Sequence, residues 1–203
     1  MKNFKYKFIA SAFAALAMVS CNDLDTAPMG STVTTDQKGE AVESNPDRIK
    51  ASIAAIPAGF YDFGKLTGEG NHNDLFYAAT MLFTDTRGMD MVSDDIGYNW
   101  FADAVDYSDI SATGFATNSI WLTAYKQISA ANSVVQTIGT YDPADEDLKY
   151  YLAQALTIRA FDYFTLAQLY QHTYVGNENK PCVLLITEEN MDEVPNVGCK
   201  RST

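Results

Sequence analysis

The sequence has little of the material from which metal centres and nucleophilic active sites are built. Among 203 residues there are only three cysteines and two histidines, and His72 and His172 stand far apart in the chain. No cysteine or histidine spacing matches a zinc site. The chain also lacks a GxSxG elbow, an HExxH helix and a glycine loop that could cradle phosphate. We therefore expect no metal, no cofactor and no catalytic residues, and interpret the protein as a non-enzyme.

Basic residues are scarce as well. The chain has 14 Lys and Arg against 26 Asp and Glu, which gives a net charge of −12. Such a surface repels nucleic acid and anionic lipid headgroups, so we expect no nucleic-acid partner.

Aromatic residues, in contrast, are plentiful: 12 Tyr, 11 Phe and 2 Trp make up 12% of the chain and supply many flat amphipathic faces.

No apolar run reaches the roughly 20 residues that a membrane-spanning helix needs. Residues 8–19 are apolar or small and follow three lysines, which is typical of a secretory signal. Residues 18–21, Met-Val-Ser-Cys, resemble a lipobox, although Leu is usual where Met18 stands. We predict a lipoprotein signal peptide over residues 1–20 and lipidation of Cys21; the alternative is an ordinary signal with a chance cysteine.

The residues behind Cys21 are poor in apolar side chains and rich in Thr, Ser, Gly and Asp. We interpret residues 21–45 as a flexible acylated tether, so that only acyl chains attach the protein to the membrane. Removal of a signal with three lysines and no acids takes the net charge from −12 to −15. Of the two remaining cysteines, Cys182 and Cys199 either pair as a disulfide in an oxidising compartment or stay free thiols.

Apolar residues recur every three or four positions in four stretches, which predicts four helices. We expect them over residues 46–63, 73–86, 118–138 and about 142–170. The residues expected to bound or interrupt them are Asn45 and Pro46 at the first start, Pro57 inside that helix, Gly88 and Gly139 at the ends of the second and third, and Asp142 and Pro143 at the start of the fourth.

The third and fourth predicted helices are separated by only a few residues, so they should be antiparallel neighbours. Residues 89–117 have no sustained period and are interpreted as a long ordered loop. Residues 183–186 are the only strand candidate. The side of the second helix expected to be buried consists of Leu75, Ala78, Ala79, Leu82 and Phe83.

Two of these helices carry recognisable patterns. Residues 121–132 read WxxxYxxIxxAN, which resembles the first signature helix of the SusD/RagB family, and residues 153–170, AQALxxRAFxYFxLxxLY, resemble the second. Residues 196–203 are similar to the linker that precedes the next helix in that family. The resemblance implies a mainly α fold of tetratricopeptide-like antiparallel helix hairpins with long loops. Residues 46–203 would form the N-terminal part of such a domain, truncated relative to the family.

The same resemblance implies a function. Proteins of this family are lipid-anchored in the outer membrane, face the cell exterior, bind oligosaccharides (peptides in some branches) and deliver them to a TonB-dependent, SusC-like transporter. We therefore expect a nutrient-binding surface lipoprotein with an oligosaccharide ligand and that transporter as partner. One alternative is a helical-repeat scaffold that binds a protein or peptide and no glycan. Another is a surface glycoside hydrolase that uses a pair of acidic residues.

The best ligand-binding candidates are Tyr98, Asn99, Trp100 and Phe101, which lie together on the long predicted loop. Sugar rings present flat C–H faces that stack on aromatic rings, and an amide can bond paired hydroxyls. The alternative is that the aromatic residues pin the loop to the core. Arg159, among apolar residues, is expected to have a structural role and to bond Asp162 or a loop oxygen.

Overall fold

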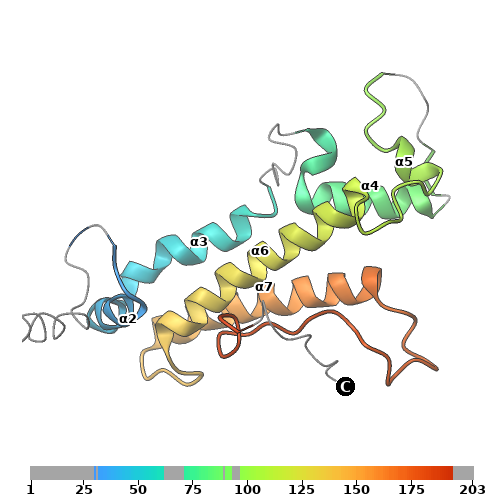
Figure 1. The fold of residues 1–203 in the computed structure, drawn as a ribbon. Coiled ribbons are helices and arrows are strands. Elements are labelled where there is room, and N and C mark those ends of the chain that lie inside the picture. The colour runs from blue at the N-terminus through green and yellow to red at the C-terminus, as the bar shows by residue number, and fades with distance from the viewer. Residues whose placement is uncertain (1–29, 31, 62–70, 89, 93–96, 194–203) are drawn as a thin grey trace, which may run out of the picture. The chain divides into compact units, whose positions relative to one another are not determined.

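The computed structural model describes residues 30, 32–61, 71–88, 90–92 and 97–193. The predicted signal peptide, Cys21 and Cys199 lie outside these residues. The described part is mainly helical, as predicted, and its elements are α2 (Thr35–Ser44), η2 (Pro46–Ile49), α3 (Lys50–Ala58), η3 (His72–Asp74), α4 (Phe76–Arg87), α5 (Ala102–Val105), α6 (Phe115–Ile138) and α7 (Glu146–Tyr170) (Figure 1). α2 makes part of the expected tether helical.

Local sequence signals set several helix boundaries. The Asn45 side chain accepts a hydrogen bond from the backbone N–H of Asp47 at the start of η2, as its predicted capping role requires. The helix that follows continues through Pro57 and ends at Ala58, short of the expected residue 63. α6 ends at Gly139, whose φ of +73° is a left-handed conformation that glycine adopts at little cost.

The start of α7 differs from the prediction. Asp145, and not Asp142, caps the helix by accepting hydrogen bonds from the backbone N–H groups of Asp147 and Leu148. Pro143 is buried in the preceding turn and does not open the helix. Both aspartates are plausible caps by residue type, and the burial of Pro143 is a tertiary feature that the local pattern does not contain.

α6 and α7 form the antiparallel pair that the short connection predicted, and α3 packs against both of them. Their shared core includes Ile53 and Ile56 of α3, with Ala131 of α6 and Ala155 of α7 fully buried between the helices. The small side chains let the backbones approach closely. α4 packs against α6 farther along the pair, where Phe83 and Ile120 belong to a second core cluster.

The buried side of α4 is rotated relative to the expectation. Ala78 is exposed, whereas Phe76 and Thr80 are buried. Thr80 can enter the core because its hydroxyl donates a hydrogen bond of 2.7 Å to the carbonyl of Phe76, one turn earlier in the helix. Because the backbone carbonyl satisfies the hydroxyl group, Thr80 can be buried although threonine is a polar residue type.

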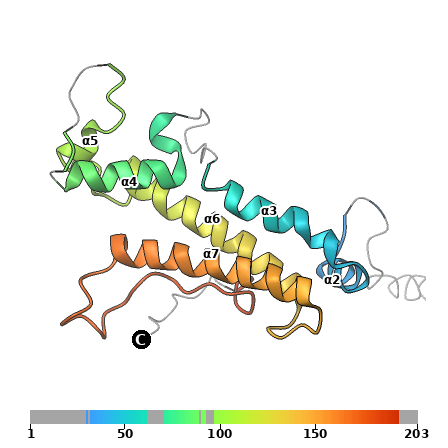
Figure 2. The same ribbon diagram turned by 180° about the vertical axis from the view of Figure 1, so that it is seen from behind.

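After α7 the chain turns back and runs along the helix pair, as both ribbon views show (Figures 1 and 2). Residues 181–190 of this segment, here called the strap, contain no strand. The prediction of a strand at residues 183–186 is therefore wrong. The strap lies against the helices without a neighbouring extended segment among the described residues, and side chains take over the bonding that a partner strand would supply.

Candidate functional site

The loop before α5 displays stacked aromatic rings. The rings of Tyr98 and Trp100 lie 5.6 Å apart at an interplanar angle of 11°. The Trp100 ring also lies 6.4 Å from the imidazole of His72, at an interplanar angle of 6°. We call His72, Tyr98 and Trp100 the aromatic stack. Tyr98 is 84% exposed, so a large planar face is open to solvent.

The backbone of the loop holds this arrangement. Asn99, between the two stacked residues, has a φ of +51°, which is uncommon for a residue other than glycine. The side-chain amide of Asn73 donates a hydrogen bond of 3.3 Å to the carbonyl of Trp100 and so ties the loop to the turn that carries His72. Asparagine adopts this left-handed conformation more readily than other non-glycine residues, so its residue type suits this position in the loop.

The four residues singled out in the sequence therefore have different positions. Tyr98 and Trp100 belong to the aromatic stack, and Asn99 lies between them. Phe101 points into the protein, with its ring 4.9 Å from that of Phe83 at an edge-to-face angle of 64°. Phe101 thus packs against the second core cluster and anchors the loop, while its neighbours present their rings outward.

His72 is the member of the stack that the sequence did not suggest. It lies 28 positions before Trp100, in the 3₁₀ turn ahead of α4. No periodicity joins the two residues. The only local signal is that polar residues of the turn precede a helix, which predicts a cap and not a ring contact.

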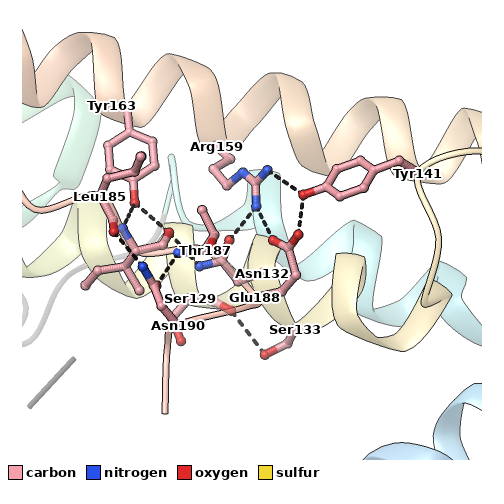
Figure 3. Close-up of polar contacts among 11 residues, drawn as sticks. Ser129, Asn132, Ser133, Tyr141, Arg159, Tyr163, Leu185, Thr187, Glu188 and Asn190 are labelled. Carbon is pink, nitrogen blue, oxygen red and sulfur yellow. Dashed lines mark hydrogen bonds and ion pairs between the residues drawn. The ribbon is translucent and has the colours of Figure 1, made fainter. Parts of the chain in front are cut away.

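A second polar assembly fixes the strap to the helix pair (Figure 3). The Arg159 guanidinium on α7 donates to the Glu188 carboxylate at 2.6 Å and to the side-chain oxygen of Asn132 at 2.8 Å. It also donates to the Tyr141 hydroxyl, which itself donates to Glu188. Arg159 has a structural role here, and its partner is a loop carboxylate. Asp162, the other expected partner, is not bonded to it.

The ionisation of this assembly reinforces it. Burial alone would raise the pKa of Glu188, but the hydrogen bonds from Tyr141 and Arg159 outweigh burial and hold that pKa below its usual value. Burial likewise opposes the charge of Arg159, yet its bonds to Tyr141 and Glu188 raise its pKa further. The pair is ionised at neutral pH, and both side chains are mostly shielded from solvent.

Side chains of the helix pair also bind the backbone of the strap. The Tyr163 hydroxyl donates to the carbonyl of Ile186 and accepts from its N–H, at 2.6 and 2.7 Å. Asn132 donates to the same carbonyl, and Tyr125 donates to that of Leu184. These bonds satisfy backbone groups that would otherwise lose water without compensation, which explains how the strap is ordered without being a strand.

Two open hollows are present elsewhere in the described residues. One, of about 400 Å³, lies beside the loop after α5 and is lined by Arg87, Ile110, Ser111, Ala112, Thr117, Ile120, Leu169 and Tyr170. The other, of about 410 Å³, lies at the end of α7 and is lined by Phe164, Ala167, Gln168, Gln171, His172, Thr173 and Tyr174. We call the second the α7 hollow. Arg87 in the first hollow is paired with Asp109 at 2.7 Å, so its charge is already neutralised.

The remaining predicted site residue in the described range is Cys182. Its thiol contacts the side-chain oxygen of Gln171 and is partly buried. Because Cys199 lies outside the described residues, the disulfide between the two stays a prediction. No helix in the described ranges has both the length and the apolar character needed to cross a membrane.

The described residues thus form a hairpin of two long helices, α6 and α7, against which α3 and α4 pack, and the loop before α5 carries an exposed aromatic ring. The family model described as "Starch-binding associating with outer membrane", SusD-like, matches residues 50–203, about three quarters of the chain. The chain belongs to this SusD-like family. No curated protein and no solved structure matched it. Members of the family are binding proteins and not enzymes, and the family is associated with the outer membrane.

Proposed function

We propose that the protein captures neutral glycans at the outer face of the outer membrane and delivers them to a TonB-dependent, SusC-like transporter. The observation that carries the proposal is the aromatic stack, in which Tyr98 and Trp100 lie nearly parallel and the Tyr98 ring is 84% exposed. A large exposed ring in a fixed orientation gains free energy when the C–H face of a sugar covers it. Family membership supports the same ligand class.

The anchor completes the proposal. Acylation of Cys21 after removal of residues 1–20 would hold the protein at the membrane, because each buried CH₂ contributes about 0.8 kcal/mol and several acyl chains act together. The acidic surface, with a net charge of −12 for the whole chain, disfavours direct contact with anionic lipids. The protein would then face the cell exterior on its tether.

The alternative of a peptide-binding helical scaffold is less well supported. A peptide laid along the helix pair would need the backbone-binding groups of Tyr125, Asn132 and Tyr163, and the strap already uses all three. Displacing the strap would also break the Arg159–Glu188 ion pair. This side of the helix hairpin is therefore occupied by the protein's own chain, whereas the aromatic stack is open.

Affinity electrophoresis of the complete lipoprotein in gels that contain soluble starch, xylan, mannan or β-glucan tests glycan binding. We expect Trp100→Ala to weaken retardation by the bound glycan about five- to thirtyfold, which corresponds to about 1–2 kcal/mol of ring contact. Tyr150→Ala is the matched control, because Tyr150 is also an exposed ring, 64% accessible, but lies on α7 away from the stack. Unchanged migration of the Trp100 variant in a gel that retards the wild type would refute the assigned site.

Delivery and anchoring need separate measurements. Affinity purification of the complete lipoprotein from outer membranes in mild detergent should recover a TonB-dependent transporter. Cys21→Ser should abolish acylation, so that mass spectrometry finds no diacylglyceryl group and the protein leaves the membrane fraction. A Cys21→Ser protein that stays membrane-bound would contradict the anchor. Failure to recover any transporter would contradict the delivery step and leave glycan capture standing.

A further inference from the structure

We propose that the α7 hollow is a second glycan-binding site, separate from the aromatic stack. The inference rests on the proposed function for its ligand class, a neutral oligosaccharide. The hollow lies between the last turns of α7 and the loop that follows, and it shares no residue with the aromatic stack. Its volume of about 410 Å³ is large enough for one or two sugar rings.

Two aromatic rings line the hollow. Phe164, on α7, is 62% exposed, and Tyr174, on the following loop, is 70% exposed. A phenylalanine exposed on a helix loses the free energy that burial would bring. Two such rings in one hollow, one from α7 and one from the loop that directly follows it, give flat apolar surfaces on which pyranose rings can stack.

The loop that carries Tyr174 is ordered by its own hydrogen bonds. The N–H of Asn177 donates to the carbonyl of Tyr174 at 2.9 Å, and the Asn177 side chain donates to the carbonyl of Thr173 at 2.8 Å. Gly176, at a φ of +83°, permits the tight turn between them. The backbone that carries Tyr174 is thus ordered before a ligand arrives, which reduces the conformational entropy that binding must overcome.

The charge of the hollow favours a neutral ligand. Its lining contains no Lys, Arg, Asp or Glu, although the chain as a whole has 40 of them by residue type, 14 basic and 26 acidic. An anion finds no cation there, and a cation finds no carboxylate. The exposed Gln168 offers an amide donor and an acceptor, and His172 adds ring nitrogens beside them. Paired donors and acceptors between aromatic rings suit the hydroxyl groups of a sugar.

Affinity electrophoresis of the complete lipoprotein, in the same starch, xylan, mannan and β-glucan gels, tests the inference. Three variants are compared with the wild type: Phe164→Ala with Tyr174→Ala, Trp100→Ala, and all three substitutions together. We expect each site's variant to weaken retardation at least about fivefold and the combination to abolish it. Phe164→Trp, which keeps a ring, should retain binding, and Tyr150→Ala serves as the control for loss of an exposed ring on α7.

The outcomes separate the two proposals. Loss only in the Trp100 variant overturns the second site and leaves the proposed function intact. Loss only in the Phe164 and Tyr174 variant supports the α7 hollow and overturns the aromatic stack as the site. A wild type that no gel retards overturns both. If the Phe164 and Tyr174 variant keeps its glycan affinity but no longer co-purifies with the transporter, the hollow is a protein contact, and the inference is wrong.

Discussion

Asp162 gives the sharpest prediction about stability. It lies on α7, is 0% exposed, and neither of its carboxylate oxygens has a hydrogen-bond partner in the described part of the chain. Desolvation raises its pKa from the ordinary 3.8 to about 8. The pKa of this carboxyl group is therefore higher in the folded protein than in the unfolded chain. Whenever the two pKa values differ, the free energy of unfolding depends on pH.

The sign and the size follow from proton linkage. Between about pH 4 and pH 8 the native state keeps a proton that the unfolded chain has released, so rising pH lowers the free energy of unfolding by about 1.4 kcal/mol per unit. By pH 7 the accumulated loss attributable to Asp162 is about 4 kcal/mol. The contribution of Asp162 to the free energy of unfolding is fully present below about pH 4 and is lost as the pH rises towards 8.

Substitution of Asp162 by Asn removes the titration while keeping the shape. Urea unfolding followed by circular dichroism should show that the variant's advantage over the wild type grows by about 3 kcal/mol between pH 5 and pH 7. Asp103→Asn, on the exposed side of α5, is the matched control and should show no such growth. A difference between Asp162→Asn and the wild type that does not change with pH would refute the argument.

Three further substitutions test the strap and the loop before α6. Tyr163→Phe deletes both bonds to the backbone of Ile186 and should lower the free energy of unfolding by about 1–3 kcal/mol, measured by urea titration. Glu188→Gln leaves a guanidinium without its carboxylate and should speed hydrogen exchange in residues 181–190, and unchanged exchange would contradict this. Gly114→Ala would overlap the carbonyl of Asp109 and should lower the melting temperature by several degrees.

Much of the helical framework could be predicted from the sequence because its signals are local. The cap at Asn45 and the stop at Gly139 depend on single residue types, and the pairing of α6 with α7 depends on apolar periodicity and a short connection. The buried side of α4 differs from the expectation because a threonine can be buried when its hydroxyl bonds the backbone of its own helix. The cap of α7 differs from the expectation because two aspartates could cap the helix and tertiary packing decides between them.

The candidate site was only partly predictable. Tyr98 and Trp100 stood out as aromatic residues on a loop, but their contact with His72 depends on how a turn and a distant loop meet in three dimensions. Phe101 is adjacent to them in the sequence, but its ring packs against Phe83 in the second core cluster. The ion-pair partner of Arg159 could not be predicted either, since Glu188 is 29 residues away and no periodicity connects the two residues.

The strap depends on side chains from α6 and α7 for its conformation. We therefore expect it to fold after these two helices have paired. Residues 184–188 have no strand ladder, and side chains of the hairpin, Tyr163, Asn132 and Arg159, supply several of the bonds that hold them. Because these bonds need the hairpin side chains in position, we expect the strap to dock after the hairpin has formed. In the folded protein we expect the strap to detach locally before the helices separate. Limited proteolysis of the native state should therefore cut first within residues 181–190.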